Sequence, residues 1–179
     1  MKLKSIDILV HSYPPNIGGI EVAVHEEVKF LELKGINVKV FTSQTNKPDT
    51  VSDTVKRYWS FKPFNAHASR LFSPMLIIDL LKSDSQVIEA HGLSILPIIG
   101  AFVAQIKNKP FYYHLHGAPT KGISKLITEL LVWYPLHRAN YWFYASGMKD
   151  HPIVKSRDKV VIVKHTNEVN EAILKKVLG

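Results

Sequence analysis

The chain of 179 residues contains no cysteine. This absence excludes disulfide bonds and thiolate metal sites, and it is typical of a cytosolic protein. The chain also has no long hydrophobic run, because its longest apolar stretch, residues 93–104, includes a proline and a glycine and is far shorter than the roughly 20 residues that span a bilayer. Residues 1–4 lead into a strand pattern that contains Asp7, without the apolar segment and cleavage site of a signal peptide. We therefore expect a cytoplasmic protein.

Acidic residues are few relative to basic ones, with 15 Asp and Glu against 23 Lys and Arg and a formal net charge of +8 at pH 7. This balance favours partners that carry phosphate, such as nucleotides, lipid head groups or nucleic acid. The basic residues are scattered, and no nucleic-acid-binding motif is present, so we expect no specific nucleic-acid partner. An apolar content of 46% with 21% charged residues is that of a folded protein, and the length suits one domain.

Strand-like runs alternate with helical patterns along the chain. They lie near residues 5–10, 36–42, 54–59, 86–90, 110–115, 140–145 and 159–164. This alternation predicts an α/β fold, a Rossmann-like parallel sheet with helices on both faces. We expect one such domain over residues 1–165. The remaining residues, 166–179, carry a short amphipathic pattern that predicts a helical tail or the start of a linker.

A glycine pair marks the turn between the first strand and the first helix. Gly18 and Gly19 follow a buried strand pattern, and Ile20, Val24 and Val28 recur at helical spacing directly after them. Two residues without Cβ atoms allow a ligand to approach the backbone closely, and the first amides of a helix favour an anion or a polar oxygen. A tight connector without a ligand explains the same glycines equally well.

Small residues and histidines follow three later strands. His91-Gly92, His116-Gly117 and Ser146-Gly147 each stand at a predicted strand end. Ligands of open parallel sheets bind outside the carboxyl ends of the strands, so we expect Gly19, His91, His116 and Ser146 to share one edge of the sheet. Capping of a following helix is the other explanation for Ser146.

Four blocks resemble family 4 glycosyltransferases in order and spacing. They are residues 13–21, ending Gly18-Gly19-Ile20-Glu21; residues 87–92, ending His91-Gly92; residues 109–117, ending His116-Gly117; and residues 139–150 around Ser146. The resemblance covers about residues 5 to 163. It implies a domain equivalent to the N-terminal half of an enzyme of the GT-B type, in which two Rossmann-like domains face each other across a cleft.

The chain departs from that family pattern at three points. It has no second set of strands and no glutamate pair with the spacing that the family uses in its nucleotide-sugar-binding domain. Residues 161–167 stand where a Pro-Asn-Gly turn normally leads into that domain. Glu89 stands where many relatives carry a histidine. The resemblance therefore implies only the acceptor-binding half, which we expect to be inactive without a donor-binding domain or partner subunit.

The chemistry implied by the resemblance is transfer of a hexose from a nucleotide sugar, as co-substrate, to the hydroxyl of a sugar or lipid acceptor, with no cofactor. His116 and His91 are the implied catalytic residues, since a neutral imidazole can hydrogen-bond a sugar hydroxyl. Gly18, Gly19, Gly117 and Ser146 are the implied substrate-binding residues.

Two other interpretations remain open. His114 and His116 lie two apart on a strand, and His91 on a neighbouring strand could complete a metal site, although no carboxylate has a convincing spacing. Alternatively, the chain is a non-catalytic subunit that binds an acceptor or a membrane for a separate donor-binding subunit. Residues 57–64 mix cations with aromatic rings, which favours a peripheral position on an anionic inner membrane surface, and packing on the domain explains them as well. An uncovered half-enzyme surface also favours a homo-oligomer.

Overall fold

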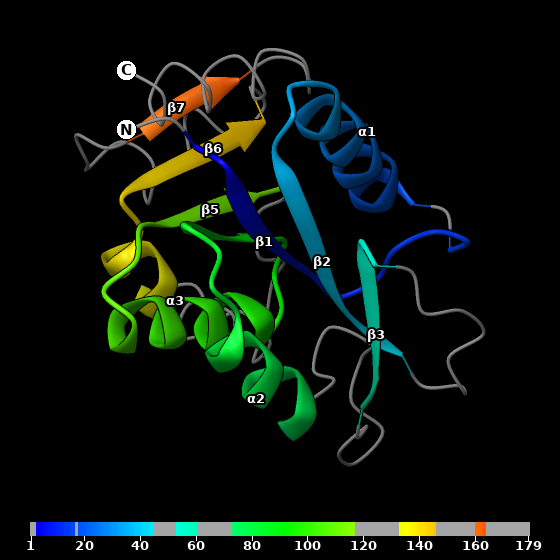
Figure 1. Ribbon diagram of the computed structural model, residues 1–179. Helices are drawn as coiled ribbons and strands as arrows, with labels where there is room; N and C mark the ends of the chain where they lie inside the picture. Colours follow the sequence, from blue (N-terminus) through cyan, green and yellow to red (C-terminus); the bar gives the residue numbers. More distant parts are fainter. Residues whose placement is uncertain are drawn as a thin grey trace, which may run out of the picture.

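The computed structural model describes residues 3–16, 18–44, 53–60, 73–116, 133–145 and 160–163. Seven parallel strands form one sheet, in the order β3-β2-β1-β4-β5-β6-β7 (Figure 1). The strands are β1 (Ser5–Val10), β2 (Asn37–Gln44), β3 (Val55–Trp59), β4 (Val87–His91), β5 (Phe111–Leu115), β6 (Tyr141–Ala145) and β7 (Val160–Val163), and the helices are α1 (Gly19–Leu33), α2 (Pro74–Lys82) and α3 (Leu96–Ile106). All seven predicted strands and the Rossmann-like α/β fold class are confirmed.

The strand order reverses at β1. The chain starts in the middle of the sheet, adds β2 and β3 on one side, and then returns to place β4 against the other side of β1. Such a reversal opens a crevice at the carboxyl ends of the two strands where it occurs, and this crevice is the usual ligand position in open α/β sheets. The topology therefore directs attention to the ends of β1 and β4.

Helix α1 covers one face of the sheet (Figure 1). Its buried side chains are Val24, Glu27, Val28 and Leu31, which recur at helical spacing on one side of the helix. Alternate residues of β1, including Ile6, Ile8 and Val10, belong to the same hydrophobic cluster. The buried side of α1 is therefore apolar except for Glu27, whose carboxyl group lies among these hydrophobic side chains.

Helices α2 and α3 cover the opposite face (Figure 1). Leu76 and Leu80 of α2 and Val103 of α3 pack there against the other set of alternate strand residues, such as Phe111 and Tyr113. Both faces are therefore filled, as predicted. The side chains of β4 and β5 that point away from this cluster face α1 instead.

A glycine ends the first helix. Gly35 adopts φ +76° directly after the C-cap of α1, and its N–H donates to the carbonyl of Glu32 at 2.9 Å. Strand β2 continues to Gln44, two residues beyond the predicted end, because it pairs with β3 through that residue. The predicted tail over residues 166–179 and its boundary at residue 165 lie outside the described residues.

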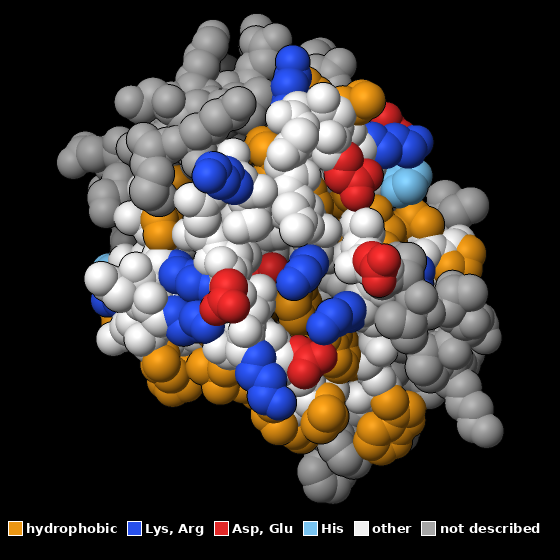
Figure 2. Space-filling model, in the orientation of Figure 1, with side chains coloured by type: hydrophobic (Ala, Val, Ile, Leu, Met, Phe, Trp, Pro, Cys, Tyr) orange, Lys and Arg blue, Asp and Glu red, His pale blue; other side chains and the backbone are white. Residues whose placement is uncertain are grey.

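The surface of the domain bears on the hypotheses of a nucleic-acid partner and of an anionic membrane partner. On the face shown in Figure 2, Lys and Arg side chains are spaced apart rather than gathered in one patch, and several adjoin acidic side chains. Arg57 donates hydrogen bonds to the backbone carbonyls of Tyr13 and Pro14. Tyr58 is buried, and its hydroxyl group donates to Asp79 at 2.8 Å. The ring of Tyr58 stacks on that of Phe41. These two members of the predicted membrane-binding segment pack on the domain instead, while Trp59 is exposed. Within the described ranges, no helix is long and apolar enough to cross a membrane.

Candidate functional site

The carboxyl ends of β1, β4 and β5 meet at one edge of the sheet. Gly92, the residue after β4, has φ +77°, and its N–H donates to the carbonyl of His114 in β5 at 2.8 Å. A Cβ atom at Gly92 would lie 3.2 Å from Cδ1 of Ile20 in α1 and 3.9 Å from Nδ1 of His11, just beyond β1. Glycine at this position therefore permits both the left-handed backbone and the close approach of the three strand ends.

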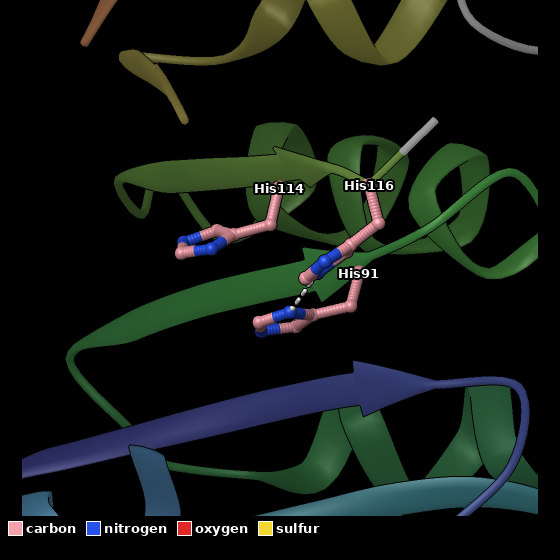
Figure 3. Close-up of side chains that lie close together, drawn as sticks. All are labelled: His91, His114 and His116. Atoms are coloured by element: carbon pink, nitrogen blue, oxygen red, sulfur yellow. Dashed lines mark hydrogen bonds between the residues drawn. The ribbon is translucent and has the colours of Figure 1, made fainter. Parts of the chain in front are cut away.

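Two of the predicted site residues contact each other at this edge. Nδ1 of His91 lies 3.1 Å from Nε2 of His116, and the two rings stack with their centroids 5.4 Å apart (Figure 3). His91 is the last residue of β4, and His116 follows β5. The expectation that these two histidines share one edge of the sheet is confirmed.

The two histidines differ in access to solvent. His91 is only 1% exposed, whereas His116 is partly exposed. Helix α1 and the sheet enclose the ring of His91, and the catalytic role that the family resemblance implies for His91 stays a prediction. His116 is the imidazole of the pair that a ligand can reach.

A buried polar cluster lies beneath His116. It consists of Glu27 from α1, Glu89 and His91 from β4, and His114 from β5. Nε2 of His91 lies 3.5 Å from Oε2 of Glu27 and 3.4 Å from Oε1 of Glu89, which also contacts Nε2 of His114. All four side chains are at most 4% exposed. We refer to these four residues as the buried cluster.

The pKa values of the cluster reflect burial first and neighbouring groups second. Burial, together with the neighbouring His114, lowers the pKa of His91 to about 4, although Glu89 acts in the opposite direction. Burial, followed by His91, also lowers the pKa of His116. Both rings are therefore neutral at pH 7, with one donor and one acceptor nitrogen each.

The two glutamates shift in opposite directions. Burial and the adjacent carboxylate of Glu89 raise the pKa of Glu27 well above its usual range. Burial acts on Glu89 in the same sense, but His114 and His91 outweigh it and hold the pKa of Glu89 below its usual value. Two adjacent carboxylates resist ionising together in a buried site, so Glu27 retains the proton of the pair.

The glycine pair begins α1 at the same edge. Gly18 is the N-cap, in extended conformation, and a Cβ atom at Gly19 would have no atom within 4 Å. The side chain of Glu21 lies against Gly18, and Oε1 of Glu21 is 3.9 Å from Nε2 of His11. A carboxylate therefore already faces the start of the helix, which disfavours a phosphate there and favours a donor such as a hydroxyl group.

The structure leaves two predicted site residues undescribed and adds others. Gly117 and Ser146 lie outside the described residues. Glu27 and His11 were missed. Glu27 falls between Val24 and Val28, so its place on the buried side of α1 was readable from helical spacing. His11 directly follows β1 and carried the same strand-end signal as His91.

The interpretation that no carboxylate stands at a convincing spacing for a metal site with the histidines is wrong. Glu89 lies two residues before His91 on the same face of β4, and Glu27 reaches the cluster from α1. Two sets of side chains have ligand atoms within 4.8 Å of one another: the buried cluster, and the three histidines His91, His114 and His116. Either set contains donor types that bind divalent transition metals.

Searches of protein-family models and of curated proteins find no match to the chain. Solved structures do match. A UDP-GlcNAc 2-epimerase from Methanocaldococcus jannaschii is 14% identical, with a TM-score of 0.59, and the match covers 96% of this chain and 50% of that one. The S. aureus MnaA-UDP co-structure is 16% identical, with a TM-score of 0.59 and coverages of 95% and 46%. An alpha-glucosyltransferase in complex with UDP and a 13-mer DNA is 12% identical, with a TM-score of 0.56 and coverages of 90% and 40%.

These similarities establish the fold alone. The chain has the Rossmann-like architecture of its GT-B-like neighbours and spans half or less of the length of each of the three. Two of the neighbours are complexes with UDP, and two are named as enzymes of nucleotide sugars or glucosyl transfer. The comparisons do not select a reaction or a ligand for this chain.

Proposed function

We propose that this chain is the acceptor-binding half of a hexosyltransferase, which moves a sugar from a nucleotide sugar to an acceptor hydroxyl. The observation that carries the proposal is the His91–His116 pair at the edge where β1, β4 and β5 end. His116 is partly exposed there, and its ring is fixed by a contact of 3.1 Å with the buried ring of His91. A neutral imidazole held in this way can donate to or accept from a sugar hydroxyl.

The charges at this edge favour the acceptor over the phosphates of the donor. Glu21 and His11 stand beside the start of α1, and Glu21 would repel a diphosphate. Hydroxyl groups, in contrast, donate to carboxylates and to imidazole nitrogens. Phosphate binding is therefore assigned to a separate donor-binding domain or partner subunit, in line with the half-length matches to the solved structures.

Within this proposal, His116 contacts the ligand and His91 positions His116. Gly18 and Gly19 allow the acceptor to approach the backbone, since open space surrounds the Cβ position of Gly19. Gly117 and Ser146 keep their proposed substrate-binding roles from the sequence resemblance. No cofactor takes part in the proposed transfer. A non-catalytic subunit that binds the acceptor for a separate donor-binding chain would use the same surface.

A nucleotide-sugar epimerase is the second candidate, because several of the solved neighbours carry that name. The two reactions differ in their need for an acceptor. A transferase releases UDP in proportion to an added acceptor hydroxyl, whereas a 2-epimerase inverts the sugar at C2 without an acceptor.

The experiment incubates the 179-residue protein with UDP-glucose or UDP-GlcNAc, with and without hexose acceptors, and follows UDP release and the C2 configuration by NMR. We expect dissociation constants for both nucleotide sugars in the millimolar range or weaker and no turnover, since transfer requires both substrates to be positioned across a closed cleft. Efficient transfer by this chain alone would refute the half-enzyme proposal, and acceptor-independent inversion at C2 would favour the epimerase.

A further inference from the structure

The buried cluster of Glu27, Glu89, His91 and His114 has the composition and spacing of a metal site. Each of the four residues offers one ligand atom, and these atoms lie within 4.8 Å of one another. Ligands bound tetrahedrally at 2.0–2.2 Å from a zinc ion stand about 3.4 Å apart. The distances of 3.4 and 3.5 Å from Nε2 of His91 to the two glutamate oxygens have this value.

Buried polar atoms in the cluster lack the hydrogen bonds that such atoms normally make. Within the part of the chain that the structure describes, neither Oε1 of Glu27 nor Nε2 of His91 has a hydrogen-bond partner, and both side chains are 1% exposed. A buried polar atom without a partner is destabilising, and an unseen ion is one of the recognised reasons for finding one. A divalent cation would satisfy these atoms together.

His116 completes the arrangement from outside the cluster. Its Nε2 lies 3.1 Å from Nδ1 of His91, so a proton on Nδ1 of His91 can be donated to His116. The lone pair of Nε2 of His91 is then free to bind an ion on the side where the Glu27 and Glu89 carboxylates lie, 3.5 and 3.4 Å away. Figure 3 shows the contact between His91 and His116. Histidine ligands of metals are typically oriented in this way by a hydrogen bond to the other ring nitrogen.

We propose that Glu27, Glu89, His91 and His114 bind one divalent transition-metal ion of the zinc class. Two imidazoles and two carboxylates suit such an ion. The ion displaces the proton that Glu27 otherwise retains, and the two resulting negative charges balance its charge. All four ligands are at most 4% exposed and come from α1, β4 and β5, so the site is closed and structural. The ion links α1 to β4 and β5, and it fixes the ring of His91, which contacts His116. The proposal does not depend on which ligand His116 contacts.

The primary test uses the wild-type chain, purified without metal-affinity steps, stripped with a chelator and titrated with Zn²⁺ and Co²⁺. We expect one ion per chain, visible Co²⁺ absorption bands of a four-coordinate site that Zn²⁺ abolishes, and a Tm that rises with the logarithm of free Zn²⁺. A stripped protein that folds but binds neither ion stoichiometrically, with no change in Tm, would overturn the proposal.

Variants locate the ion. Glu27→Gln should weaken Zn²⁺ binding at least about tenfold, whereas Glu26→Gln, on the neighbouring exposed residue, should leave it unchanged. His116→Ala should weaken binding by about 10–100-fold while retaining the Co²⁺ bands, since it removes an orienting partner rather than a ligand. Equal binding by wild type and a folded Glu27→Gln protein, checked by circular dichroism, would place the ion elsewhere and refute the site.

Discussion

Single residues at the strand ends determine how closely β1, β4 and β5 approach. Gly92 combines a left-handed backbone with contacts to Ile20 and His11, whereas Gly19 stands in open space. The first glycine is thus required by the fold. The second is not required by packing and is available for a role in ligand approach.

Gly92→Ala should destabilise the protein by roughly 1–2 kcal/mol, because a left-handed conformation costs about that much for a residue with a Cβ atom. Gly19→Ala should leave stability unchanged or raise it by up to about 1 kcal/mol, since alanine favours the helix. Urea unfolding measures both. Equal effects of the two substitutions would contradict the distinct roles assigned to these glycines.

Asp7 gives a pH-dependent prediction away from the site. It is fully buried in β1, and its Oδ2 accepts a hydrogen bond of 2.7 Å from Ser85, yet burial raises the pKa of its carboxyl group. The folded state therefore binds this proton more tightly than the unfolded state, and the resulting stability is lost as pH rises through the folded pKa.

Asp7→Asn removes this loss. The free energy of unfolding of the variant relative to wild type should therefore increase between pH 4 and pH 7, measured by urea unfolding at each pH. Asp53→Asn, at an exposed position, controls for the removed charge. A relative stability of Asp7→Asn that falls with rising pH would contradict the assignment.

At the scale of elements, the strands were readable from the sequence because each is a short apolar run between turn residues. The run at residues 86–90 predicted β4, and in the observed strand, Val87–His91, the alternation of side chains puts Glu89 and His91 on one face. The sequence did not show which element packs on that face of β4. Helical spacing put Glu27 on the buried side of α1, but only the packing of α1 over β4 and β5 shows that Glu27 meets Glu89 and His91.

The packing of α1 can be tested with a matched pair of leucines. Leu31 is fully buried against the sheet, whereas Leu33 is 86% exposed. Leu31→Ala should cost about 2–5 kcal/mol of stability through lost burial and a cavity, while Leu33→Ala should change it by no more than about 0.5 kcal/mol. Urea unfolding at pH 7 distinguishes them, and a small effect at Leu31 would mean that α1 does not pack as described.

At the scale of the whole molecule, one sheet with a reversal of strand order at β1 brings the site residues together. His91 and His116 are 25 residues apart in sequence, yet they meet because β4 and β5 are parallel neighbours. The chain spans half or less of the length of the solved structures named above. The proposed transfer therefore assigns donor binding to a second domain or subunit. The central claim is that this edge of the sheet binds a sugar.

The most direct test of that claim is NMR of the histidine ring signals during titration with methyl glucoside, methyl N-acetylglucosaminide and UDP-glucose. We expect saturable shifts of the His116 ring with at least one hexose, at most millimolar affinity for UDP-glucose, and hexose binding at least about tenfold weaker in His116→Ala. The exposed His137 provides the control signal, and His137→Ala the control variant. A folded protein whose His116 signals shift with none of these sugars would contradict the account.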